Sequence, residues 1–244
     1  MSTLNITSKD MSGRDYSFTD FDKKDLTGVD FSNSVLGFAT FSQTNLTHAI
    51  MRYAYSLGAS FKHTEMLHAN LSCAYLSGAS FINSNMQGAN LSFADLTVTK
   101  FINSYLGDVY IYGANLREAK LRDTVLQDAS MCHSNLFRAI LSDVNMRDAF
   151  LSFANLRSAS LDKVDMTNVN FISADMRNVS LLDVILTNAN MRGVNLSNAY
   201  LSKVYLIGVN LTDANMTRTA LSEVNLTGAN FTGANLTGAT GLKL

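Results

Sequence analysis

Proline and tryptophan are both absent from this 244-residue chain, and cysteine occurs only twice. Two cysteines cannot build the dense disulfide network that stabilises small secreted domains. No stretch approaches the roughly 20 consecutive apolar residues of a transmembrane helix. The first residues, MSTLNITSKDMSGRDY, hold no apolar run that could serve as a signal peptide. We therefore expect a cytoplasmic protein with no membrane partner.

An excess of charge of either sign is also missing. The 19 basic and 20 acidic residues leave a formal net charge of −1. The whole chain is therefore neither a polycation that seeks nucleic acid nor a strong polyanion, and we expect no direct binding of nucleic acid. Hydrophobic residues make up 47% of the chain, which is enough to form a core and argues against disorder.

The chain contains a repeat of five residues, which is clearest in NLTGANFTGANLTG at 225–238. We call the Leu or Phe of each unit its central residue. Central residues recur every five positions from Ile6 to Leu236, and all are apolar except Ser56. The residue two positions earlier is Ala, Val, Ser or Thr in every unit from Val29 to Ala239. The phase never shifts, so the repeat contains no insertion.

A period of five residues fits neither a helix nor a straight strand. On an α-helix five residues advance about 500°, so the central residues would form no apolar face. On a straight strand an odd period sends successive central residues to opposite sides. The small residue and the central residue are two apart and share one side of a short extended segment. The pattern therefore predicts short strands separated by turns, in a chain that coils on itself.

Matching residues 20 positions apart predict the length of one coil. Phe recurs at 21, 41, 61, 81 and 101, and the same spacing separates His48 from His68 and Tyr55 from Tyr75. Identical side chains tend to stack in neighbouring strands. Twenty residues are four units, so we expect a coil with four sides and about 12 coils in the chain.

The unit A-(D/N)-L-x-x, seen in ANLTG, ANFTG, ADLTV and ANLRE, resembles the repeat of the pentapeptide-repeat protein family. The resemblance covers about residues 16–240. It implies an all-β fold, a right-handed quadrilateral parallel β-helix, here without the loop insertions that several antibiotic-resistance members carry. We expect a single domain over residues 1–244, with residues 237–244 as a C-terminal tail. Residues 1–20 are expected to form an irregular N-terminal cap, because Lys9, Arg14 and Lys24 stand where small inward residues belong.

A coil filled by its central residues leaves no concave, partly dry site of the kind that enzymes need. We therefore expect no enzyme activity, no catalytic residues, no cofactor and no metal site. His48 and His68 stack one coil apart but lack an evident third ligand. Cys73 and Cys132 are nearly three coils apart, too far for a disulfide, and are expected to be free.

Two outer surfaces are candidates for binding. Around Ser56 the outward positions are unusually apolar, and such patches often mark interaction sites. An alternative is that Leu57 turns inward in place of Ser56 and that the aromatic residues cover the distortion. This apolar patch consists of Val35, Phe38, Ile50, Tyr53, Tyr55, Leu57, Tyr75 and Phe93. The second surface is an acidic face that consists of Asp25, Glu65, Asp108, Asp128, Asp148 and Asp165.

These surfaces correspond to two possible functions. The first is a non-catalytic rod-shaped scaffold that binds an unidentified protein partner through its outer faces. The second comes from the resemblance, because some family members protect DNA gyrase, a type II topoisomerase, from quinolones or toxins by mimicking DNA. Mimicry needs dense negative charge along the rod, since DNA carries one charge per ~1.7 Å of its axis. The near-neutral chain favours the general binder.

The C-terminal coil is the most regular of all, and the segment TGATGLKL at 237–244 is too short for a capping helix. Open strand edges recruit other chains, although Leu242 and Leu244 could lie across the open core. We expect a second copy to meet this end about a twofold axis, which gives an end-to-end homodimer. A monomer covered by water and the tail is the alternative.

Overall fold

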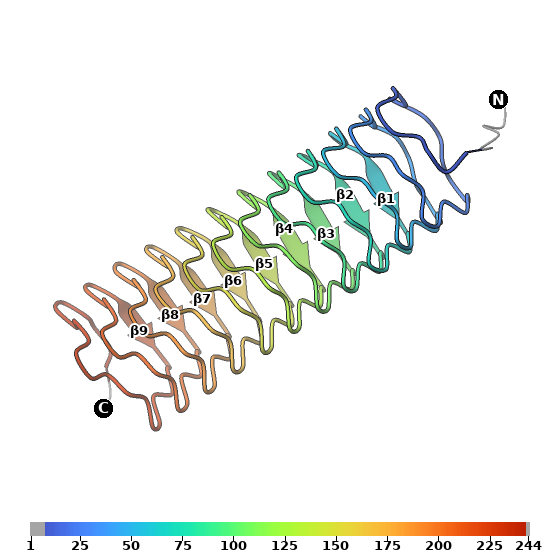
Figure 1. The fold of residues 1–244 in the computed structure, drawn as a ribbon. Helices are drawn as coiled ribbons and strands as arrows, with labels where there is room; N and C mark the ends of the chain where they lie inside the picture. Colours follow the sequence, from blue (N-terminus) through green and yellow to red (C-terminus); the bar gives the residue numbers. More distant parts are fainter. Residues whose placement is uncertain (1–7, 243–244) are drawn as a thin grey trace.

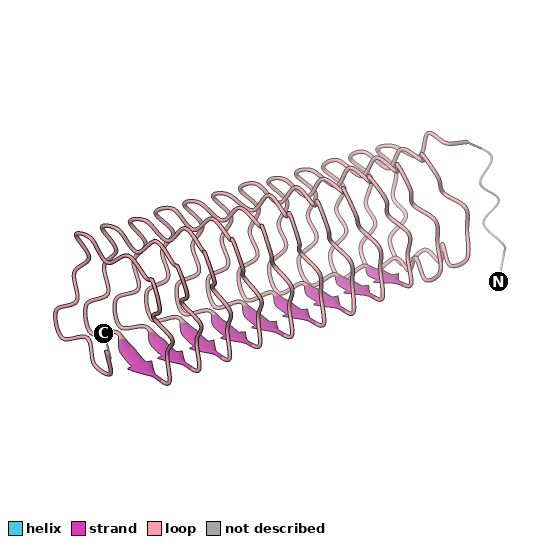
Figure 2. Ribbon diagram, turned by 90° about the horizontal axis from the view of Figure 1, so that it is seen from below, coloured by secondary structure: helices cyan, strands magenta, loops and turns pink. Residues whose placement is uncertain are grey.

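The computed structural model describes residues 8–242, which form a rod of stacked coils whose first and last described residues lie at opposite ends (Figure 1). Nine parallel three-residue strands follow one another along one side of the rod, and this part of the chain contains no helix (Figure 2). The strands are β1 (Ser60–Lys62), β2 (Ser80–Ile82), β3 (Lys100–Ile102), β4 (Lys120–Arg122), β5 (Ile140–Ser142), β6 (Ser160–Asp162), β7 (Ser180–Leu182), β8 (Tyr200–Ser202) and β9 (Ala220–Ser222).

Every pairing joins residues 20 positions apart, so the expected coil of four units is confirmed. In β1 and β2, for example, Phe61 pairs with Phe81. Isolated bridges of the same offset form three further ladders. The ladders define four faces, numbered in chain order. Face 1 carries the strands, face 2 the row from Asp25 to Asn225, face 3 the row from Asp10 to Asn230, and face 4 the row from Asp15 to Asn235.

The inward positions predicted by the repeat are the ones that are buried. Central residues such as Phe61, Met66 and Leu71 have no exposed surface, and neither has the small residue Ala69 between them. The five-residue phase therefore places two side chains per unit in the core and three outside. The column of central Phe residues on face 1 is stacked, with ring centroids 4.7–5.0 Å apart from Phe61 to Phe101, which also measures the spacing of the coils.

With the exception of Ser134, hydroxyl groups at the small inward positions have specific partners. Thr64 and Ser84 donate their hydroxyl hydrogens to the carbonyl oxygens of Phe41 and Phe61, at 2.8 and 2.6 Å. These bonds offset the cost of burying a hydroxyl in an apolar core. Ser and Thr are therefore tolerated at an inward position where Ala and Val are otherwise found.

The corners of the coil explain the preference for Asn or Asp before the central residue. In the unit around Leu26, Asp25 Oδ1 accepts a hydrogen bond from the backbone N–H of Thr27, 3.1 Å away, and the N–H of Val29 donates to the carbonyl of Leu26 at 3.0 Å. Gly28, between them, has a φ of +64°. A bond across four residues with a left-handed third residue describes a type II turn. Asn, Asp and Gly favour these two roles.

Ser56 points into the core, whereas Leu57 is 52% exposed. The alternative in which Leu57 replaces Ser56 inside is therefore wrong, because such a swap would break the two-residue alternation that the neighbouring bridges impose. The Ser56 hydroxyl oxygen has no hydrogen-bond partner. The column of central residues thus contains one buried hydroxyl group, at Ser56, that forms no hydrogen bond.

The two ends of the rod differ. Lys9 and Arg14 are exposed rather than inward, yet the bridges already include Asp10. At the other end Leu242 is half-buried and packs against the core, while Leu244 lies outside the described residues. The division of the chain into a cap, a domain and a tail stays a prediction.

Candidate functional site

The apolar patch lies on two consecutive faces, face 3 and face 4, and all of its side chains are exposed. Their exposed fractions range from 37% for Ile50 to 59% for Phe93. Val35, Tyr55 and Tyr75 occupy three successive places in the outer row of face 4. The eight residues are thus brought to the surface of neighbouring faces, as the phase of the repeat requires.

Several patch side chains hold one another in place. The rings of Tyr55 and Tyr75 stack with centroids 4.6 Å apart and planes within 5°. The guanidinium carbon of Arg52 lies 5.4 Å from the centre of the Tyr53 ring. The Phe38 ring lies against Gly58 of the next coil, where a Cβ on Gly58 would come within 2.7 Å of the ring. The absence of a side chain at Gly58 therefore lets Phe38 lie in this position.

Sequence reasoning missed aromatic residues that extend the patch in both directions. Phe18, 77% exposed, stacks on Phe38 at 5.4 Å. Phe93 contacts Tyr112 edge-on, with ring centroids 5.4 Å apart. The Tyr112 ring in turn contacts His133, and the His133 ring stacks on Phe153. A signal was available, because positions 93, 133 and 153 belong to one 20-residue series. The missed exposed aromatic residues on face 3 are Tyr110, Tyr112, His133, Phe150 and Phe153, and Phe18 lies at the edge of face 4.

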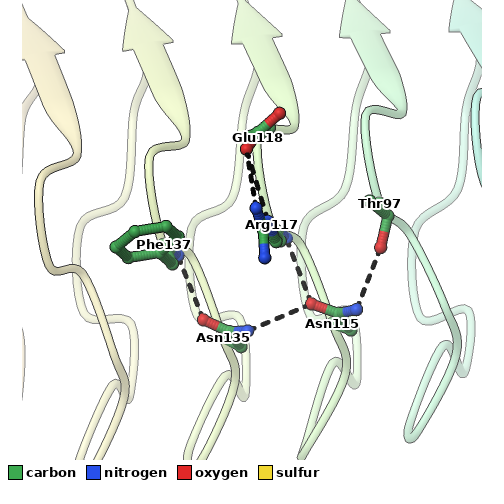
Figure 3. Close-up of polar contacts among 6 residues, drawn as sticks. All are labelled: Thr97, Asn115, Arg117, Glu118, Asn135 and Phe137. Atoms are coloured by element: carbon green, nitrogen blue, oxygen red, sulfur yellow. Dashed lines mark hydrogen bonds and ion pairs between the residues drawn. The ribbon is translucent and has the colours of Figure 1, made fainter.

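Beyond Tyr75 the outer row of face 4 changes character and becomes a polar ladder. Asn115 donates to the hydroxyl of Thr97 at 2.9 Å, and Asn135 donates to the side-chain oxygen of Asn115 at 3.2 Å. Figure 3 shows this chain of amides crossing successive coils, with Arg117 turned toward Glu118. The ladder satisfies its own polar groups and marks the limit of the patch on this face.

The acidic residues do share face 2, but they do not form one continuous surface. Asp108, Asp128 and Asp148 follow one another at the corner, while Gly88 precedes them and Asn168 follows. Asp148 accepts a hydrogen bond from Asn168 at 3.0 Å. Asp25 and Glu65 lie several coils away, and Asp165 is paired with Arg147 at 3.5 Å. The dense part of the acidic face is therefore a row of three carboxylates.

Hydrogen bonds of the corner type tune the acidity of three aspartates near the N-terminal end. The hydroxyls of Ser12, Ser17 and Thr27 donate to Asp10, Asp15 and Asp25 and lower the pKa of each carboxyl. On face 4 the hydrogen bond from the Arg177 guanidinium lowers the pKa of Asp175. These shifts follow from the turn geometry and the adjacent cation, so they do not identify a reactive site.

The histidine pair and the two cysteines do not form a metal site or a disulfide in the described residues. His48 and His68 stack with ring centroids 5.5 Å apart, and residues 8–242 contain no group of three side chains suited to hold a metal ion. Cys73 and Cys132 are free and partly buried. The same part of the chain has no helix able to span a lipid bilayer.

Two solved structures match most of this chain at low sequence identity. No curated protein matches the sequence. Among solved structures, HetL, a pentapeptide repeat protein involved in heterocyst differentiation regulation from the cyanobacterium Nostoc sp. strain PCC 7120, is 23% identical over 96% of this chain and 91% of its own, with a TM-score of 0.31. A trypsin-treated form of QnrB1, a plasmid-mediated fluoroquinolone resistance protein, is 20% identical over 82% of this chain and 90% of its own, with a TM-score of 0.47.

The family model described as pentapeptide repeats matches eight overlapping or adjacent copies. Each copy is longer than one 20-residue coil, so the number of copies is smaller than the number of coils that the bridges define. The copies lie at residues 17–47, 25–55, 39–74, 74–109, 114–152, 151–188, 180–218 and 205–240. Since they cover nearly the whole described rod, the chain belongs to the pentapeptide repeat family.

Proposed function

We propose that the chain is a non-catalytic, rod-shaped scaffold that binds a protein partner through the apolar patch on faces 3 and 4. The observation that carries this proposal is the break in the outer row of face 4. From residue 95 to residue 235 every place in this row is Asp or Asn, but Val35, Tyr55 and Tyr75 interrupt the pattern. These three side chains cannot accept the corner hydrogen bond that Asp or Asn accepts from the residue two positions later.

Replacing Asp or Asn by an exposed aromatic ring loses the corner hydrogen bond and therefore lowers stability. Residues that lower the stability of their own local structure are expected at functional sites. Exposed apolar surface rimmed by polar residues is typical of protein interfaces. Tyr is enriched among the residues that dominate binding energy. The Tyr55 and Tyr75 rings are already stacked on each other. These two side chains would therefore lose little conformational entropy when a partner binds them.

The row of acidic residues on face 2 supports a second candidate, a DNA mimic that protects a type II topoisomerase. Three carboxylates in successive coils repeat at about 4.8 Å, whereas DNA carries one charge per ~1.7 Å of its axis. The row ends after three coils, so the charge available is small for a mimic. The stacked aromatic patch favours the general binder.

The experiment compares capture of proteins by four forms of the chain in a lysate of the source cells. The patch variant is Tyr55→Ser with Tyr75→Ser, and the control is Tyr200→Ser with Tyr205→Ser, two exposed tyrosines on faces 1 and 2. The fourth form reverses the charge of the acidic row. We expect a protein that the wild type and both other forms retain and that the patch variant loses. Equal capture by all four forms would refute binding at the patch.

A further inference from the structure

Two lysines face each other in neighbouring strands of face 1. Lys100 of β3 pairs in register with Lys120 of β4, and both side chains are exposed. Like charges placed directly opposite each other in a sheet are destabilising. At the corner that follows these strands, the series begins with two like charges, Asp123 and Asp143, and alternates only from Lys163 to Asp183 to Lys203. The lysine pair, like the row of Asp108, Asp128 and Asp148 on face 2, is therefore an arrangement that folding alone does not favour.

The lysine pair also lacks a counter-ion. Over residues 8–242 neither lysine forms an ion pair, and Arg138 forms none either. The two acids nearest to Lys120 along the chain are already engaged. Glu118 is bound by Arg117 at 3.3 Å, as Figure 3 shows, and Asp123 is bound by Arg122 at 3.2 Å. Over the described residues, the three cations on this edge of the rod thus have no ion-pair partner.

These cations surround a hollow at the edge between face 4 and face 1. Two adjoining concavities share Lys100, Lys120 and Ile140 in their lining, and one of them also includes Arg138. Arg138 is anchored, since its guanidinium carbon lies 5.0 Å from the centre of the Phe137 ring. The remaining lining is half apolar and half polar: Val98 beside Glu118 in one concavity, and Ile102 and Leu121 beside Arg122 and Ser142 in the other.

We propose that this edge is a binding site for a phosphomonoester dianion. Coils are 4.7–5.0 Å apart at the Phe61–Phe81–Phe101 stack, so the stems of Lys100 and Lys120 project from the sheet at about this separation. One tetrahedral oxyanion has enough oxygens to accept a charge-assisted bond of about 2.7–2.9 Å from each ammonium group. Arg138 adds a third positive charge at the next coil.

The charge and the lining together select the class of ligand. A single carboxylate would neutralise only one of the three cations, whereas a phosphomonoester carries close to two negative charges at pH 7. The apolar side chains of Val98 and Ile140 favour an ester whose other end is apolar over a bare ion. This site lies outside the apolar patch, so it goes beyond the proposed function and does not depend on it.

Titration of the whole chain with phenyl phosphate and with inorganic phosphate, followed by the amide signals of residues 98–142 in NMR spectra, tests the site. We expect saturable shifts with both probes and tighter binding of phenyl phosphate. Lys100→Gln with Lys120→Gln should weaken phenyl phosphate binding by roughly tenfold or more, the effect of removing two charge-assisted bonds. The matched control, Lys163→Gln with Lys203→Gln, changes two exposed lysines of the same face and should bind as the wild type does.

Two further readouts separate binding from misfolding and from simple charge attraction. The Lys100 and Lys120 variant relieves repulsion, so its unfolding temperature should be unchanged or raised. Binding should weaken as the pH falls through about 6, where the phosphate loses its second charge. Shifts that do not saturate, or equal binding by the two lysine variants, would overturn the site. Equal affinity for the two probes would overturn the role of the apolar lining.

Discussion

Ser56 offers a direct test of how the core column is built. Its side chain is fully buried, its hydroxyl has no partner, and the places one coil away on either side are the buried Leu36 and Leu76. An unpaired buried hydroxyl costs about 1–3 kcal/mol. Replacing Ser56 by Ala removes that cost at the expense of a small void, so we expect a gain of about 1 kcal/mol in the free energy of unfolding.

Ser56→Leu should stabilise the protein more than Ser56→Ala does. Leu restores the side chain found in the coils on both sides, and each added methylene group contributes about 0.8 kcal/mol when it is buried. Together with the removed hydroxyl, the expected gain is about 3 kcal/mol. Thermal unfolding followed by circular dichroism measures the order of the three forms, and hydrogen exchange of residues 50–80 locates the gain in the affected coils.

Two other serines supply the controls. The hydroxyl of Ser134 is also buried without a partner, so Ser134→Ala should stabilise the protein as Ser56→Ala does. The hydroxyl of Ser34 donates to the carbonyl of Phe31 at 2.6 Å, so Ser34→Ala should destabilise it by about 1 kcal/mol. The reasoning fails if Ser56→Leu lowers the unfolding temperature, because the column would then have no room for the side chain.

Gly58→Ala should destabilise the protein more than Gly78→Ala in thermal unfolding, because both glycines have positive φ but only Gly58 lies under the Phe38 ring; equal losses would show that the ring moves freely. Stability should fall as the pH drops below about 4, because carboxyls of the unfolded chain take up protons there, whereas the same groups in the folded protein, whose pKa is lowered, stay charged to a lower pH. Since Asp175 is one of them, Asp175→Asn should flatten this dependence in acid titrations of the unfolding temperature, and an unchanged slope would assign it to other groups. Reversing the charge of Asp108, Asp128 and Asp148 should leave folding intact in circular dichroism spectra; in a gyrase supercoiling assay with a quinolone, the DNA-mimic candidate requires protection by the wild type that this variant loses and that salt weakens, and no protection by the wild type removes it. The expected end-to-end dimer would scatter light as twice the 26.6 kDa chain, and a mass that stays at one chain at every concentration excludes it.

The sequence was sufficient to predict the fold because the repeat acts locally. Every unit carries its own inward pair, such as Ala69 and Leu71, and its own turn, so the phase alone assigns each side chain to the core or the surface. The spacing of Phe61, Phe81 and Phe101 also predicted which residues would stack. Little depends on contacts between distant parts of the chain other than the next coil.

The surface was harder to interpret, because the phase of the repeat predicts that a side chain points outward but does not predict which neighbouring side chains it contacts. The contact of Tyr112 with His133 joins two different places of the unit across one coil, and no single 20-residue series reveals it. The unpaired state of Lys100 and Lys120 depends on where Arg117 and Arg122 direct their guanidinium groups. Side-chain directions of this kind are decided by competition between neighbours and not by the period.

Photo-crosslinking from the patch tests directly whether a protein partner binds there. A photoreactive amino acid is placed at position 75 in the patch or, in a separate form, at position 205 on face 2, since both positions hold exposed tyrosines. After irradiation in the source cells, we expect a crosslinked protein partner from position 75 and none of the same mass from position 205. Crosslinks of equal yield from both positions, or from position 205 alone, would contradict binding through the apolar patch.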